Sequence, residues 1–73
     1  MDRTLAQAHL ALTEEHIAQG ERHIVRQRDL VDLLSSGGCD TQYARALLHK
    51  FEESQVMRLA ERDRLRKELQ QPS

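Results

Sequence analysis

Three of the four histidines in the chain, His9, His16 and His23, follow one another at intervals of seven residues. Imidazole rings bind metals and move protons near neutral pH, so this row is the first place to look for chemistry. On one helix a step of seven separates successive rings by about 10.5 Å, whereas two ligands of one metal ion stand three or four residues apart. We therefore expect no metal and no cofactor. We interpret the row as imidazoles that lie at the margin of a helical bundle and form hydrogen bonds with a carboxylate across the seam, with a shared metal site and pH-sensitive association as the alternatives.

The basic segment from Arg58 to Glu68 is the second candidate site. Its five basic residues are offset by Glu61, Asp63 and Glu68, and it holds no aromatic residue on which a base could stack. The chain has a formal net charge of −1 at pH 7, whereas phosphate binding calls for a strongly basic surface. We expect a charge-paired helix face here, and nucleic acid is not the expected partner.

Enzyme motifs do not occur in the 73 residues: there is no nucleophile elbow, phosphate-binding loop or metal-hydrolase motif. The single cysteine, Cys39, cannot form an internal disulfide, which is typical of a reducing compartment. The N-terminal residues lack the basic and apolar segments of a signal peptide, and no run approaches the roughly 18 apolar residues of a membrane span. We expect a cytoplasmic protein that is not an enzyme and has no membrane partner.

The elements that position these residues are two helices separated by one break. The sequence SSGGCDT at residues 35–41 lies between two stretches that contain one other glycine and no proline before Pro72. Paired glycines supply the positive φ common at helix C-termini. The sequence therefore predicts an all-α fold, a two-helix antiparallel hairpin, with helix one at about 3–35, a loop at 36–40, helix two at about 41–70 and a short tail at 71–73.

Capping residues mark both helix starts. Asp2 or Thr4 can accept hydrogen bonds from the first turn of helix one, and Thr4 can form a capping box with Gln7. Asp40 or Thr41 can do the same for helix two.

Apolar residues in helix one recur every seven positions, which is typical of left-handed supercoiled packing. If the chain folds back at the two glycines, residues that face each other have numbers that total about 75. This register brings Ile24 to Phe51 and Leu10 to Leu65, so apolar residues meet. The predicted hairpin core comprises Leu10, Ile17, Ile24, Val31, Leu47, Leu48, Phe51, Leu65 and Leu69.

Charge favours the same register. Up to Glu21 the chain carries four acidic residues and one basic residue, whereas residues 58–67 contain five basic and two acidic ones. Exposed ion pairs are worth about 0.2–1 kcal/mol each, so they specify antiparallel pairing more than they stabilise it. Gln55, Arg58 and Arg62 lie on the inner side of helix two, where polar residues can fix the register, and we expect Glu14 or Glu21 as the partners of the two arginines.

Helix one has more apolar surface than one neighbouring helix can cover. A second stripe, with the histidine row at its edge, lies beside the first, and two neighbours are implied. Cyclic dimers are the commonest closed assemblies, so a homodimer forming a four-helix bundle is the expected homo-oligomer. The predicted self-association face comprises Leu5, Leu12, His16, His23, Leu30 and Leu34.

Two segments, GERHIVRQRDLV at residues 20–31 and DTQYARALLHKFEES at residues 40–54, resemble short proteobacterial proteins with the same helical-hairpin layout. That resemblance implies the hairpin fold and brings no known activity with it. We expect a non-enzymatic module for protein–protein interaction or an adaptor with an unidentified protein partner. The architecture of such a dimer is similar to that of the small plasmid RNA-binding protein Rop, so weak RNA or DNA binding is the alternative function.

Overall fold

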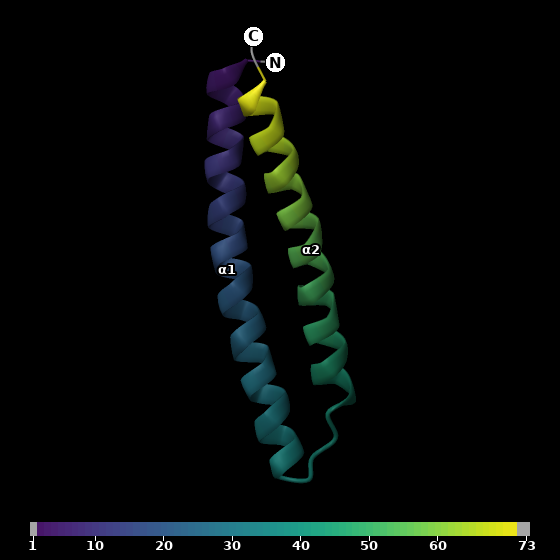
Figure 1. Ribbon diagram of the computed structural model, residues 1–73. Coiled ribbons are helices and arrows are strands. Elements are labelled where there is room, and N and C mark those ends of the chain that lie inside the picture. The colour runs from purple at the N-terminus through teal and green to yellow at the C-terminus, as the bar shows by residue number, and fades with distance from the viewer. Residues whose placement is uncertain (1, 72–73) are drawn as a thin grey trace.

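Two long helices and one tight connection make up the described part of the chain (Figure 1). The computed structural model describes residues 2–71, with helix α1 at Arg3–Ser36 and helix α2 at Gln42–Gln70. The helices lie side by side and run in opposite directions, which gives a rod with principal extents of 58 × 14 × 13 Å. The predicted all-α hairpin is confirmed, and the helix ends fall within about a residue of the expected ones. Of the predicted tail, Gln71 is extended and residues 72–73 lie outside the described part.

Helix α1 begins with an aspartate cap. The side chain of Asp2 accepts a hydrogen bond of 2.9 Å from the backbone N–H of Thr4. Thr4 already lies inside the helix, one position after Arg3, so the predicted capping box of Thr4 and Gln7 is wrong. A cap of this kind contributes about 1 kcal/mol, because it satisfies one of the four free N–H groups of the first turn.

The loop closes helix α1 through two backbone hydrogen bonds. Cys39 N–H donates to Leu34 C=O at 2.9 Å, and Gly38 N–H donates to Ser35 C=O at 3.1 Å. This pair of bonds is the Schellman arrangement, which requires a left-handed residue directly after the C-cap, here Gly37. Gly38 fills that position with φ of 73°, so the second glycine of the pair is the one whose conformation demands glycine.

Two polar residues, Asp40 and Thr41, directly precede the first residue of helix α2. The carboxylate of Asp40 accepts from the N–H of Gln42 at 3.0 Å, while the hydroxyl of Thr41 accepts from the guanidinium of Arg45 at 2.9 Å. Of the two predicted capping residues, Asp40 therefore supplies the bond to the backbone.

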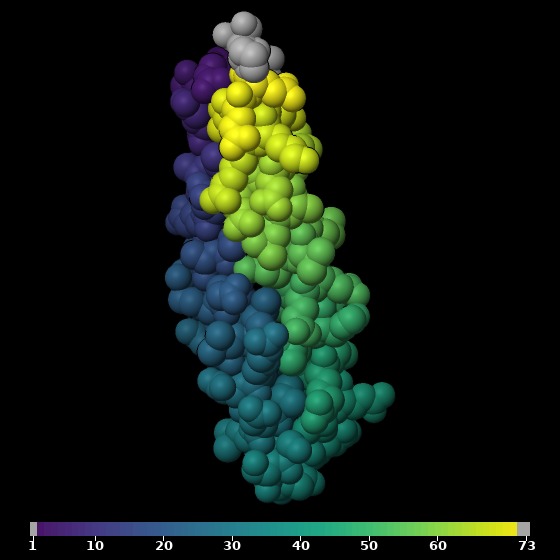
Figure 2. All heavy atoms as spheres, in the orientation of Figure 1, coloured from purple at the N-terminus to yellow at the C-terminus, as the bar shows by residue number. Residues whose placement is uncertain are grey.

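The contact between the helices is an antiparallel coiled-coil seam. In α1 the buried or half-buried residues alternate at spacings of four and three, from Ala6 through Leu34, and in α2 the same spacing runs from Ala44 to Leu69. Phe51 packs against His23 with ring centroids 5.8 Å apart, and their numbers total 74, close to the expected 75. On the face shown in Figure 2, side chains fill the space between the two ribbons.

The predicted core residues all face this seam to some degree. Leu65 has no exposed surface and Ile24 and Val31 are also buried, so Leu65 alone contributes about 1.5–3 kcal/mol. The other predicted core residues, Leu10, Ile17, Leu47, Leu48, Phe51 and Leu69, are half-buried. A hairpin two helices thick has no position enclosed on all sides, and this explains the partial burial.

Small and polar residues take up much of the remaining seam. Ala6, Thr13, Gly20 and Gln27 follow one another at intervals of seven on α1, and all four are buried. Across from them Gln55 is also buried. The interior of the hairpin is thus narrow and polar in its middle third.

Candidate functional site

The antiparallel seam gives the hairpin two lateral sides with different chemistry. On one side Arg28 binds Glu52 at 3.1 Å, and Arg66 binds Glu14 at 2.9 Å. Both pairs join α1 to α2, so we call this the ion-pair side. The expected partnership of Glu14 or Glu21 with Arg58 or Arg62 is wrong, because Glu14 pairs with Arg66, four residues further along helix α2 than Arg62.

The opposite side carries the histidine row, and we call it the histidine side. His9 Nε2 lies 3.7 Å from a carboxylate oxygen of Glu61 across the seam, close enough for an ion pair but beyond the distance of the expected hydrogen bond. His23 instead stacks obliquely on Phe51. Among residues 2–71 no group of three or more histidine, cysteine, aspartate or glutamate side chains is arranged to hold a metal ion.

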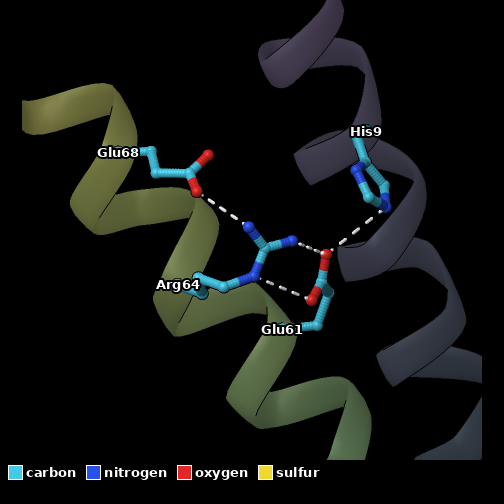
Figure 3. A network of polar contacts seen from close by, with 4 residues as sticks. All are labelled: His9, Glu61, Arg64 and Glu68. Atoms are coloured by element: carbon cyan, nitrogen blue, oxygen red, sulfur yellow. Dashed lines mark hydrogen bonds and ion pairs between the residues drawn. The ribbon is translucent and has the colours of Figure 1, made fainter. Parts of the chain in front are cut away.

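A polar network on the histidine side holds the C-terminal part of α2 (Figure 3). The guanidinium of Arg64 lies between Glu61 and Glu68, donating to both, with 2.7 Å to Glu68. The hydrogen bond from Arg64 holds the pKa of Glu61 below its ordinary value, and Glu61 in turn raises the pKa of Arg64. His9 approaches the same carboxylate from α1, so the network joins both helices.

The basic segment is largely neutralised by its own neighbours. Arg62 binds Asp63 at 3.0 Å, Arg64 binds two glutamates, and Arg66 binds Glu14. A guanidinium that already donates to a carboxylate must give up that bond before it can bind a phosphate. The geometry therefore offers little support for nucleic-acid binding.

The predicted self-association face is mostly exposed. Leu5, Leu12 and Leu30 expose 68%, 51% and 42% of their surface, and His16 and His23 are also exposed. Leu34 is half-buried, because it continues the buried series of Ala6 in the seam.

Leu33, which sequence reasoning did not single out, has 71% of its surface exposed and lies on the same side as Leu5 and Leu12. Leu33 follows Leu12 by three intervals of seven residues, and this spacing could have assigned it to the same face. The exposed surface formed by alternating steps of four and three is here called the His–Leu stripe, and its members are Leu5, His9, Leu12, His16, Gln19, His23, Arg26, Leu30 and Leu33.

Two glutamines are buried in the seam: Gln55, which was expected on the inner side of helix two, and Gln27, which sequence reasoning did not single out. Gln27 donates to Ala44 C=O at 2.9 Å, and Gln55 donates to Ile17 C=O at 2.9 Å and to Glu21 at 3.1 Å. The other amide atom of Gln55, Oε1, is buried without a hydrogen-bond partner among the described residues. These bonds cross the seam, so they fix which turn of α2 lies against which turn of α1.

Gly20 lies directly opposite this glutamine. A Cβ at position 20 would stand 2.2 Å from Gln55 Oε1 and 2.8 Å from Arg58 Nη1. Glycine is therefore present in the middle of helix α1 because the polar side chains of α2 fill the space where a methyl group would be.

The hollows on the surface are open and lie along helix edges. One of them, about 370 Å³, is lined by residues of α1 alone, between Glu21 and Asp29. Cys39 is exposed in the loop, far from the histidine row. Residues 2–71 thus show no pocket in which a nucleophile, a base and an oxyanion donor converge.

Comparison of the chain with protein-family models, with curated proteins and with solved structures finds no match in any of the three. The resemblance to short proteobacterial hairpin proteins stays a prediction. Within the described residues, neither helix contains a stretch long and apolar enough to pass through a membrane.

Proposed function

We propose that the chain is a cytoplasmic, non-enzymatic helical hairpin that associates with a second copy of itself and serves as a small protein–protein interaction or adaptor module. One observation carries the proposal: the hairpin buries glutamine, threonine and glycine in its seam, while leucine and methionine side chains lie on its surface. Met57 is 73% exposed and Leu33 is 71% exposed, whereas Gln55 is 5% exposed. Leu65, Ile24 and Val31 are buried as well, but an independent domain rarely combines buried glutamines with several large apolar side chains that are more than half exposed.

The size of the histidine side fits a second copy. The His–Leu stripe runs from residue 5 to residue 33, a length of about 42 Å, and two adjacent helices are about 20 Å wide. Such a face covers on the order of 800 Å², which is the area each partner contributes to a standard stable interface. The surface of the whole chain is 5648 Å², so association through this side would cover about one-seventh of it.

A second copy would also bury apolar surface that the two helices of one hairpin leave exposed. Chains this short bury too little apolar surface alone, and association is a common remedy where disulfides and metals are missing. Pairing two hairpins turns four exposed or partly exposed leucines of each chain into the interior of a four-helix bundle.

The proposal is tested by measuring the mass of the protein in solution by light scattering or sedimentation equilibrium over a micromolar concentration range. We expect a dimer. A well-folded monomer throughout that range would overturn the proposal.

The face is tested by a matched pair of variants, Leu12→Lys and Val25→Lys. Both residues lie on α1 and both expose 51% of their surface, but only Leu12 belongs to the His–Leu stripe. Lysine is a good helix former, so neither change should unfold α1. We expect Leu12→Lys to give monomers and Val25→Lys to leave the dimer intact, with circular dichroism confirming that both stay helical. Equal dissociation by the two variants would show that the histidine side is not the interface.

A further inference from the structure

We infer that the second copy docks antiparallel on the histidine side, α1 against α1, with the two-fold axis at Gln19 and the two loops at opposite ends of the bundle. This inference rests on the proposed self-association and adds its geometry. It follows from two matches that this register creates: leucines meet at the ends of the His–Leu stripe, and Glu15 meets Arg22 beside it.

The apolar residues of the stripe lie toward its two ends. In an antiparallel pair centred on Gln19, facing residues have numbers that total about 38, so Leu5 faces Leu33 of the partner subunit. In the same register His9 faces Leu30 of the partner subunit. Each pair occurs twice because of the two-fold symmetry, and the same patch serves both copies. Between these ends Leu12 faces Arg26 of the partner subunit, so leucine meets leucine only at the ends of the stripe.

The charges beside the stripe fit the same register. Glu15 and Arg22 stand one interval of seven apart on the outer edge of the stripe, and their numbers total 37. In the antiparallel pair Glu15 therefore faces Arg22 of the partner subunit, twice per dimer. Within residues 2–71 neither side chain takes part in an ion pair of the hairpin. A parallel pair in register would instead bring Glu15 to its own copy and Arg22 to its own copy, which opposes that arrangement.

The position of Met57 on helix α2 is consistent with a two-fold axis at Gln19. Across the hairpin, Gln19 lies level with residue 56, next to Met57. Met57 is 73% exposed, and its position in the seven-residue repeat of α2 puts it on the histidine side. The axis through Gln19 thus passes beside Met57, which would contact its own copy.

Pairing of α1 with α2 of the partner is the competing arrangement, and it places both loops at the same end. The matching surface of α2 consists of Tyr43, Lys50, Met57 and Arg64 beside Leu47, Ser54, Glu61 and Glu68. Most of these residues are polar or charged, and Arg64 is already engaged by Glu61 and Glu68. That surface offers one leucine, Leu47, whereas a second α1 brings Leu5 and Leu33 together twice per dimer.

Cysteine cross-linking tests the register. In a Cys39→Ser background, Gln19→Cys places two thiols at the axis, within reach of the 4.4–6.8 Å between Cα atoms that a disulfide spans. The matched control is Arg26→Cys, in the same column of the stripe, because two copies of residue 26 are offset by 14 residues, about 21 Å. We expect rapid oxidation to covalent dimer for Gln19→Cys and none for Arg26→Cys. Mixing Arg26→Cys with Leu12→Cys should restore cross-linking, because these two positions face each other.

The native cysteine provides a second measurement on the unmodified sequence. Cys39 is the one cysteine of the chain and is exposed in the loop. A spin label there reports the loop-to-loop distance, which is about 54 Å in the inferred dimer and below about 25 Å when both loops lie at one end. A dimer with the short distance, or one in which Gln19→Cys fails to cross-link, would overturn this geometry while leaving self-association standing. A monomer would overturn both.

Charge reversal tests the flanking pair. Glu15→Arg alone and Arg22→Glu alone each bring like charges together twice per dimer, and we expect dimerisation about tenfold weaker in each. The double exchange should return the dissociation constant to that of the unmodified protein. A double exchange no tighter than either single change would contradict the pairing.

Discussion

Replacing Gly20 by alanine should destabilise the hairpin even though alanine is the better helix former. In an open helix position this change gains about 1 kcal/mol. Here the new Cβ would lie 2.2 Å from Gln55 Oε1 and 2.8 Å from Arg58 Nη1. Both atoms are at the ends of side chains, so the side chains move and the backbone stays.

The cost follows from the hydrogen bonds that Gln55 must release. It donates to Ile17 C=O at 2.9 Å and to the Glu21 carboxylate at 3.1 Å. Two such bonds contribute about 2 kcal/mol together, since one acceptor is charged and exposed. Set against the helix gain, Gly20→Ala should lower the free energy of unfolding by about 1 kcal/mol.

The effect of Gly20→Ala on stability should change sign when the side chain of Gln55 is shortened. In a Gln55→Ala background the space opposite position 20 is empty, and Gly20→Ala should then raise stability by about 1 kcal/mol. The coupling between the two positions is thus about 2 kcal/mol, within the range seen for residues in contact.

The measurement is denaturant unfolding followed by circular dichroism, on the four proteins of the cycle at one total concentration, because association contributes to stability. Ala11→Gly, at an exposed position of α1, calibrates the glycine-to-alanine difference in this helix. If Gly20→Ala stabilises equally in both backgrounds, the contact between Gly20 and Gln55 does not form and the polar seam is wrong.

Three further predictions concern the loop, the seam and the ion network. Gly38→Ala should lower the free energy of unfolding by about 1–2 kcal/mol because φ is 73° there, whereas Gly37→Ala, at φ of −82°, should be neutral or slightly stabilising in the same denaturant titration. Gln27→Ala removes the donor to a buried backbone carbonyl and should destabilise by about 1 kcal/mol; an unchanged unfolding midpoint would contradict the buried bond. Arg64 lowers the pKa of Glu61 from 4.5, so this carboxylate stabilises the fold above that pH and the contribution is lost as pH falls through the depressed pKa. The free energy of unfolding should therefore fall less between pH 7 and pH 3 in Glu61→Gln than in the unmodified protein. An equal fall in both proteins would rule out a contribution of Glu61.

The helices and their break were predictable because they depend on local chemistry. Gly38 must adopt a left-handed conformation, and the stretches on either side of the loop contain residues that favour helix. The register of the two helices could also be predicted from the sequence, because the spacing of apolar residues and the distribution of charge favour the same register. These features are determined by neighbours within a few residues or by a repeat.

The buried glutamines were less accessible. Burying an amide is unfavourable unless it finds partners, and the partners of Gln27 and Gln55 are backbone carbonyls of the opposite helix. Those acceptors come within reach only after the helices pack. The position of Gln55 in the sequence placed it on the inner side of helix two, but the sequence did not identify the carbonyl that it binds.

The boundary of the self-association face depends on a finer effect. A straight helix turns 100° per residue and drifts by about 20° per seven residues relative to a supercoiled seam. Over the four repeats from Ala6 to Leu34 this drift reaches about 80°. A straight wheel therefore groups Leu34 with the exposed leucines, whereas the packed helix turns it into the seam and leaves Leu33 outside.

The hydrogen bond of 3.0 Å from Arg3 to the carbonyl of Leu69 joins the first turn of α1 to the last turn of α2. Both ends of the hairpin therefore leave the rod at one point (Figure 1). In the inferred antiparallel dimer the two points of departure lie at opposite ends, separated by about 48 Å along the bundle. A domain fused to either terminus of one hairpin would therefore be separated along the bundle from the same domain on the other hairpin. The inferred dimer would act as a spacer between these two domains.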